Sequence, residues 1–140
     1  HSIAEKVPLA VCAALAASIA RRKAERDEIL ERQGITIEGW EEAERHWAEA
    51  IRRETQRGGT TLLSAYDDAY IGQIEIERGP ITEQEYARLI VASERGIEHE
   101  ALVAMDLPRG AMLRLRRVWL KKSASDPILA KRVRDAVDEQ

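Results

Sequence analysis

The side-chain types that most often bind metals or act as nucleophiles are few in this chain. His46 and His99 both lack a glutamate three residues earlier, which is the spacing used by carboxylate-bridged metal sites in helical bundles. Cys12, the only cysteine, lies in an apolar run, which favours a buried and unreactive thiol. Gly58 and Gly59 lack the following lysine of a phosphate-binding loop. The sequence therefore predicts a protein that is not an enzyme and has no metal or cofactor.

One segment, residues 109–122, is strongly basic. It contains no acidic residue, and helical spacing along it would give a surface able to contact phosphates. Residues 102–122 also fit a helix-turn-helix with its turn at 106–110. The whole chain, however, has a net charge of −3, with 22 basic and 25 acidic residues. We therefore expect a protein partner for this segment, and a nucleic-acid-binding regulator is the less favoured alternative.

The elements that would position these residues are all helical. Ala, Glu, Arg and Leu are abundant, and turn residues divide the chain into about six helices. The first runs to about residue 33, whole or broken near residue 20, and Gly34 suits the position after a helix end. Thr36 is the predicted N-cap of the second helix, and Thr82 with Glu85 forms a predicted capping box. The remaining helices are expected at about 60–78, 82–105, 108–124 and 126–138.

The two parts of the chain match when one is shifted by 72 residues. The turn near Gly34 falls on Asp106, and a five-residue shortening aligns the last helices. This predicts two related three-helix halves, residues 1–78 and 81–140, packed as one compact all-α domain and each anchored on a tryptophan. Chance agreement between helical segments is the alternative. The matched apolar and basic residues are Leu30 with Leu102, Arg45 with Arg117, Trp47 with Trp119, Leu62 with Leu129, Tyr66 with Val133, and Tyr70 with Val137.

A family resemblance rests on the apolar spacing and turns of both halves. The second half carries Thr82-Glu-Gln-Glu-Tyr-Ala-Arg-Leu89, then Leu102 and Trp119, and the first half runs from Arg26 through Gly34-Ile-Thr36 to Trp40 and Trp47. This pattern resembles an uncharacterised family of tandem helical-repeat proteins of proteobacteria, found near type VI secretion components. The resemblance implies an adaptor or accessory role, and the family has no catalytic residues to carry over.

The expected functional surface is a groove where the two halves meet. Trp47 and Trp119 are expected in the core, and a second copy of the chain is one candidate partner. The charge-free run at residues 7–20 is too short to span a bilayer, so we expect a buried helix and no membrane, with a targeting remnant as the alternative. A single cysteine favours a cytoplasmic location. The residues predicted to contact the partner are Trp40, Tyr70, Arg109, Arg114, Arg117 and Lys121.

Overall fold

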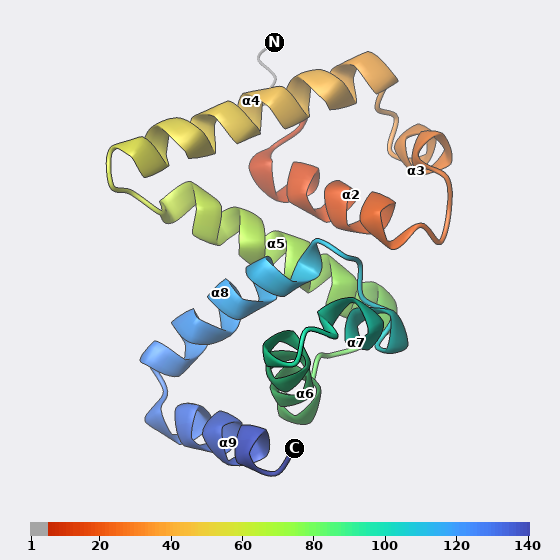
Figure 1. Cartoon of the computed structure of the whole chain (residues 1–140). Helices are drawn as coiled ribbons and strands as arrows, with labels where there is room; N and C mark the ends of the chain where they lie inside the picture. The colour runs from red at the N-terminus through yellow and green to blue at the C-terminus, as the bar shows by residue number, and fades with distance from the viewer. Residues whose placement is uncertain (1–5) are drawn as a thin grey trace. The chain divides into compact units, whose positions relative to one another are not determined.

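The computed structural model describes residues 6–140, and within that range it contains eight α-helices and no strand (Figure 1). The all-α class predicted from the sequence is confirmed. The chain divides into two compact units, residues 1–73 (unit 1) and 74–140 (unit 2), and the boundary falls inside α5. The helices are α2 (Leu9–Arg21), α3 (Arg26–Arg32), α4 (Ile37–Gln56), α5 (Thr61–Arg78), α6 (Glu83–Glu94), α7 (Glu98–Ala104), α8 (Ala111–Ala124) and α9 (Pro127–Asp138).

The described helices outnumber the predicted six because two expected helices are interrupted. The first is broken after α2, where Arg22 adopts a left-handed conformation with φ 56°. The helix expected at 82–105 is broken at Gly96, with φ 76°, which separates α6 from α7. A left-handed residue ends a helix because its amide turns back toward earlier carbonyls. In addition, α8 begins at Ala111, and Pro108 lies buried in the preceding turn.

The predicted helix starts are confirmed by their side-chain hydrogen bonds. The Thr36 hydroxyl accepts a hydrogen bond of 3.0 Å from a backbone amide in the first turn of α4. Thr82 and Glu85 exchange the two bonds of a capping box, at 3.0 and 3.1 Å. The Asp126 carboxylate caps α9, whose first residue is Pro127. Each cap joins residues close in sequence, which is why the sequence alone predicts them.

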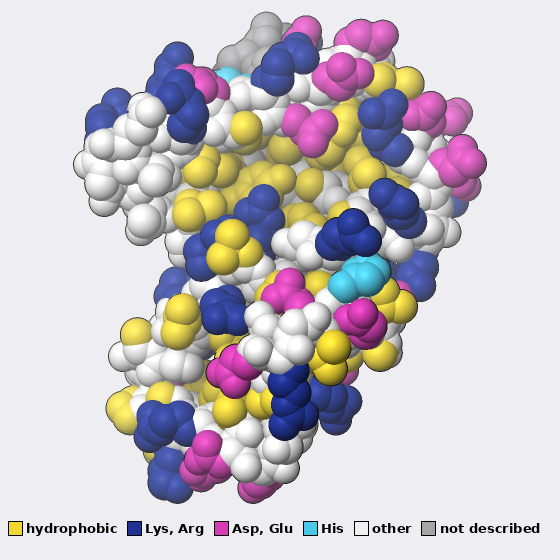
Figure 2. Space-filling view, viewed as in Figure 1, with side chains coloured by type: hydrophobic (Ala, Val, Ile, Leu, Met, Phe, Trp, Pro, Cys, Tyr) yellow, Lys and Arg dark blue, Asp and Glu magenta, His cyan; other side chains and the backbone are white. Residues whose placement is uncertain are grey.

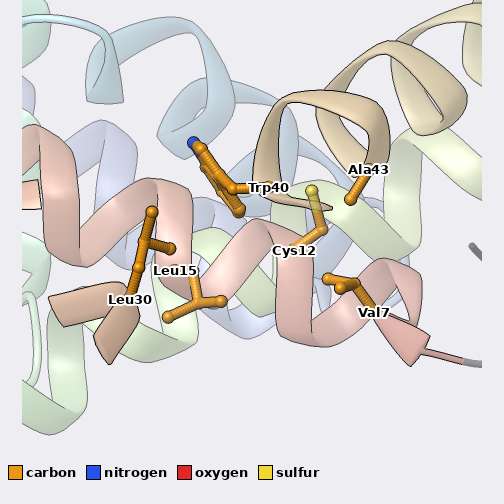
Figure 3. Packing of buried hydrophobic residues seen from close by; sticks show 6 residues of the cluster. All are labelled: Val7, Cys12, Leu15, Leu30, Trp40 and Ala43. Atoms are coloured by element: carbon orange, nitrogen blue, oxygen red, sulfur yellow. The ribbon is translucent and has the colours of Figure 1, made fainter. Parts of the chain in front are cut away.

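In unit 1, α2 packs on α3 and α4, and α3 packs on α4. Trp40 is 2% exposed, whereas Trp47 is only partly buried at the edge of the core. The Trp47 indole N–H donates a 2.9 Å hydrogen bond to the Val7 carbonyl, which ties α4 to the start of α2. The central side chains of this core, shown in Figure 3, are Val7, Cys12, Leu15, Leu30, Trp40 and Ala43.

In unit 2, α6 packs on α7 and α9, and α8 packs on α9. The rings of Tyr86 and Trp119 stack between α6 and α8, with centroids 4.7 Å apart and planes 10° from parallel. Trp119 is 6% exposed, so its predicted core position is confirmed. Other large buried side chains of unit 2 are Ile74, Ile81, Leu89, Leu102, Met105, Leu107, Met112, Leu115 and Val118.

The Arg78 side chain joins three segments of unit 2. Its Nε donates to the Met105 carbonyl at 2.8 Å, a second nitrogen donates to the Pro80 carbonyl at 3.2 Å, and a third contacts the Glu85 carboxylate. Burial by itself would raise the pKa of Glu85, but the hydrogen bonds from Arg78 and the Thr82 backbone outweigh it and lower that pKa. Arg78 therefore holds the end of α5, the start of α6 and the turn after α7 together.

The turns that end α3 and α7 have the same hydrogen bonds, and the turn that ends α4 has them as well, since the Glu54 carbonyl accepts from the Arg57 and Gly59 amides at 3.0 and 2.9 Å with left-handed Gly58 between them. Helices α3 and α7 both have seven residues, and α7 begins 72 residues after α3. In the turns after these two helices, one leucine carbonyl accepts hydrogen bonds from two later amides, both at 3.0 Å after α3 and at 3.2 and 2.9 Å after α7. A left-handed residue lies between those amides, with φ 68° and 57°. The equivalent residues are Leu30, Gln33, Gly34 and Ile35 in unit 1, and Leu102, Met105, Asp106 and Leu107 in unit 2.

Candidate protein-binding surface

Two of the six residues predicted to contact a partner are buried. Trp40 lies in the unit 1 core, and Tyr70 is 6% exposed. The Tyr70 ring stacks against Tyr66 at 6.5 Å, with the planes 23° apart. Both side chains lie on the inward faces of their helices, so neither is presented to a partner while the protein is folded. Their predicted position on the binding surface therefore needs correction, because the packing of each helix turns these apolar rings inward.

The other four predicted residues lie on or directly before α8. Arg109 is exposed in the turn that precedes the helix, and Lys121 is exposed near its end. Arg114 and Arg117 are half-buried, and they and Lys121 also interact within the chain. The spacing of three and four residues places Arg114, Arg117 and Lys121 in one row along α8. The structure thus keeps the four basic residues together on one segment of unit 2.

Two leucines on α8 are exposed, and neither was among the residues predicted from the sequence to contact a partner. Leu113 is 62% exposed and Leu120 is 61% exposed. Their seven-residue spacing puts both on one helix face, about 10 Å apart, next to the basic row. The opposite face of α8 carries the buried residues Met112, Leu115 and Trp119. The sequence feature that could have identified them is their seven-residue spacing, which forms a second apolar stripe on the helix. We define the α8 surface as Leu113, Arg114, Arg117, Leu120 and Lys121.

The remaining basic residues of α8 contact the unit 2 core. The Lys122 ammonium lies 5.3 Å from the centroid of the Trp119 ring, a cation–π contact. Burial raises the pKa of Tyr86, and the nearby positive charge of Arg116 partly offsets that rise. Figure 2 shows hydrophobic side chains beside Lys and Arg side chains over the part of the molecule that contains α8 and α9. The α8 surface is thus an apolar pair flanked by positive charge.

In unit 1, two shallow depressions flank the turn that joins α3 to α4. They have volumes of about 540 and 370 Å³ and share Gly34, Ile35 and Thr36. The apolar lining residues are Val7, Leu30, Ile35 and Ile37, and Lys6 is the one basic lining residue. Figure 2 shows acidic side chains gathered over α3 and the first turns of α4. The carboxylates that line these α3–α4 depressions are Asp27, Glu31, Glu38 and Glu42.

Two of the residues considered for catalysis and metal binding, Cys12 and His46, pack against other side chains of unit 1. Cys12 is buried, and burial, followed by the negative charge of Glu44, raises the pKa of its thiol to about 11. The thiol is therefore protonated and shielded at neutral pH. His46 lies edge-on against the Trp47 ring at 4.7 Å. Among residues 6–140, no group of three or more His, Cys, Asp or Glu side chains is arranged to hold a metal ion.

Comparison with protein-family models, curated proteins and solved structures finds no match to this chain. Within residues 6–140, no helix has both the length and the apolar character needed to cross a membrane.

Proposed function

We propose that this protein is a non-catalytic protein-interaction module that binds an acidic partner through the α8 surface. One observation carries the proposal: Leu113 and Leu120 are each more than 60% exposed on the helix that also carries a row of three basic residues. Isolated exposed leucines are common, but two on one helix face beside like charges make a small amphipathic docking surface.

The energetics of such a surface favour a protein partner. Full burial of a leucine stabilises a complex by about 1.5–3 kcal/mol before the cost of association is subtracted. The neighbouring Arg114, Arg117 and Lys121 would contribute mainly to the rate of encounter and to the orientation of an acidic partner. A partner segment with two apolar side chains and flanking carboxylates would satisfy both features.

A nucleic-acid-binding regulator is the alternative, and the basic row supports it. Arg and Lys are the usual contacts to phosphate oxygens. The exposed leucines weigh against this alternative because they would face a polar, charged backbone and gain little from burial there. The net charge of −3 for the whole chain also gives no general attraction to nucleic acid.

The equal lengths of α3 and α7 and their separation by 72 residues support an internal duplication as part of the proposal. Both helices have seven residues, and each ends in a turn of the kind that also ends α4. We infer two related halves, residues 1–78 and 81–140, that share the buried position of Leu30 and Leu102 while their surfaces have diverged. Such a scaffold suits an adaptor or accessory protein, and the resemblance to helical-repeat proteins near type VI secretion components would place it in the bacterial cytoplasm.

A peptide-binding assay tests the proposed function. The probe is a synthetic amphipathic helix with leucine on one face and glutamate beside it, and binding is followed by fluorescence anisotropy. We expect Leu113→Ser with Leu120→Ser to weaken binding at least about tenfold, because two apolar contacts are lost. Val103→Ser is the matched control, since Val103 is a 63% exposed apolar residue on α7 of the same unit.

The same variants distinguish the alternative when random duplex DNA replaces the peptide. Salt-dependent DNA binding that survives the leucine replacements, together with no measurable peptide binding, would support the nucleic-acid reading. If Val103→Ser weakens peptide binding as much as the double leucine variant does, the α8 surface is not the binding site.

A further inference from the structure

We infer that the acidic partner of the α8 surface is a second copy of this chain, which docks through its α3–α4 depressions. This inference rests on the proposed function, because it uses the same α8 surface and names what binds there. The contact would join two different surfaces, one from each molecule, and so would be heterologous.

Charge complementarity is the first argument. The α8 surface has three basic residues, and Ala111–Ala124 contains no acidic residue at all. The α3–α4 depressions are lined by four carboxylates and one lysine, Lys6. A row of Arg and Lys placed against a rim of Asp and Glu would be attracted and oriented in water. Two α8 surfaces placed against each other would repel, so the second copy must offer a different face.

The apolar side chains of the two surfaces also match. The α8 surface has two exposed leucines, and two of the depressions formed by the described residues of unit 1 flank the α3–α4 turn. Both depressions share Ile35, and Val7 and Ile37 add apolar lining. Each volume, about 540 and 370 Å³, exceeds that of a leucine side chain. Leu113 and Leu120 would therefore lie against the apolar side chains of these shallow depressions, whose carboxylates have the charge opposite to that of the neighbouring Arg and Lys side chains.

The heterologous geometry has a consequence for assembly. The two surfaces are different, so a contact made through the α8 surface of one molecule does not itself use that molecule's α3–α4 depressions. Contacts of this kind produce rings when the rotation closes and open chains when it does not. We therefore expect self-association that increases with protein concentration and that weakens as salt is added, because salt screens the attraction between charges at a protein surface.

Two charge-reversal variants of the full chain test the contact. Variant A carries Arg117→Glu and Lys121→Glu on the α8 surface, and variant B carries Glu31→Lys and Glu42→Lys, one on the rim of each depression. Sedimentation velocity over a wide concentration range measures association, and circular dichroism checks the fold. Variant A would place acid against acid and variant B base against base, so each alone should associate at least about tenfold more weakly than the natural sequence.

A mixture of the two variants is the decisive sample. The acidic α8 surface of variant A complements the basic rim of variant B, and the basic α8 surface of variant B complements the acidic rim of variant A. Association should therefore return when the two are mixed. If variant A or variant B fails to fold, the same sedimentation measurement is made on the double variant Leu113→Ser with Leu120→Ser, which removes the apolar contacts without changing charge. Val103→Ser is its control.

The outcomes separate this inference from the proposed function. A natural sequence that stays monomeric at every concentration, yet binds the acidic peptide through its leucines, overturns self-docking and leaves the interaction module standing. Association that is unchanged in variants A and B also overturns self-docking. A monomer that binds only duplex DNA, or only phosphatidylcholine vesicles containing phosphatidylserine, overturns both proposals.

Discussion

Replacement of Trp40 by alanine tests where the unit 1 core is centred. The Trp40 side chain is 2% exposed and packs in the cluster with Cys12 and Leu30. A buried aromatic side chain removes about 150–250 Å² from water, and at about 25 cal/mol per Å² that area corresponds to about 4–6 kcal/mol. Since the alanine side chain retains part of this burial, we expect a loss of about 3–5 kcal/mol in the free energy of unfolding.

Trp47 gives the comparison on the same helix. It is partly buried, and its indole N–H donates one hydrogen bond to the Val7 carbonyl. Replacement of Trp47 by phenylalanine keeps most of the packing and removes that bond, so we expect a loss of about 1 kcal/mol. The predicted loss in the free energy of unfolding is therefore much larger for Trp40→Ala than for Trp47→Phe. Trp40→Leu should give an intermediate loss, and it serves as a milder variant at the same position.

Urea unfolding followed by far-ultraviolet circular dichroism and tryptophan emission measures these losses. A slope of about 1–2 kcal/mol per M converts a loss of 4 kcal/mol into a shift of about 2–4 M in the unfolding midpoint of unit 1. Trp119 is the only tryptophan of unit 2, so in a chain that carries Trp40→Ala together with Trp47→Phe the emission comes from unit 2 alone and reports whether the loss is confined to unit 1. If Trp47→Ala destabilises the protein more than Trp40→Ala, the placement of the core is wrong.

Three further outcomes follow from the structure. Cys12 should resist alkylation at pH 8 in the folded protein and react after unfolding in urea, because its buried thiol has a pKa of about 11; fast labelling of the folded protein would contradict this. The lowered pKa of Glu85 means that its contribution to stability is present above the ordinary glutamate pKa of 4.5 and is lost as pH falls. The free energy of unfolding of Glu85→Gln should therefore change less between neutral and acidic pH than that of the natural sequence. An equal pH dependence of the two proteins would contradict this role of Glu85. Gly34→Ala should destabilise by about 1–2 kcal/mol since φ there is 68°, whereas Gly72→Ala, inside α5 with open space at its Cβ, should stabilise by about 0.5–1 kcal/mol in thermal melts; the same sign for both would contradict the backbone assignment.

The sequence was sufficient for features that depend on neighbours in the chain. The helix starts at Thr36, Thr82 and Asp126 are determined by a side chain and an amide within three residues of each other. Gly34 and Gly79 mark helix ends for the same local reason, since both have positive φ. The break after α2 was harder to predict because its left-handed residue is Arg22, which carries no glycine signal.

The candidate site was predicted only in part. The basic row of α8 followed from residue type and spacing, and the structure keeps it on one helix. Leu113 and Leu120 were missed because an apolar residue in an amphipathic helix is first assigned to the core. Only the packing of α8, which buries Met112 and Leu115 on the other face, shows which of its two apolar stripes is left outside.

Trp40 and Trp47 show the same division between sequence and tertiary structure. Their seven-residue spacing placed both on one stripe of α4, and the sequence determined that stripe and the helix that carries it. It did not determine which tryptophan is central, because that depends on where α2 and α3 cross α4. Helix pattern is a property of neighbouring residues, whereas burial depends on contacts between residues distant in the chain, and only the tertiary structure decides those.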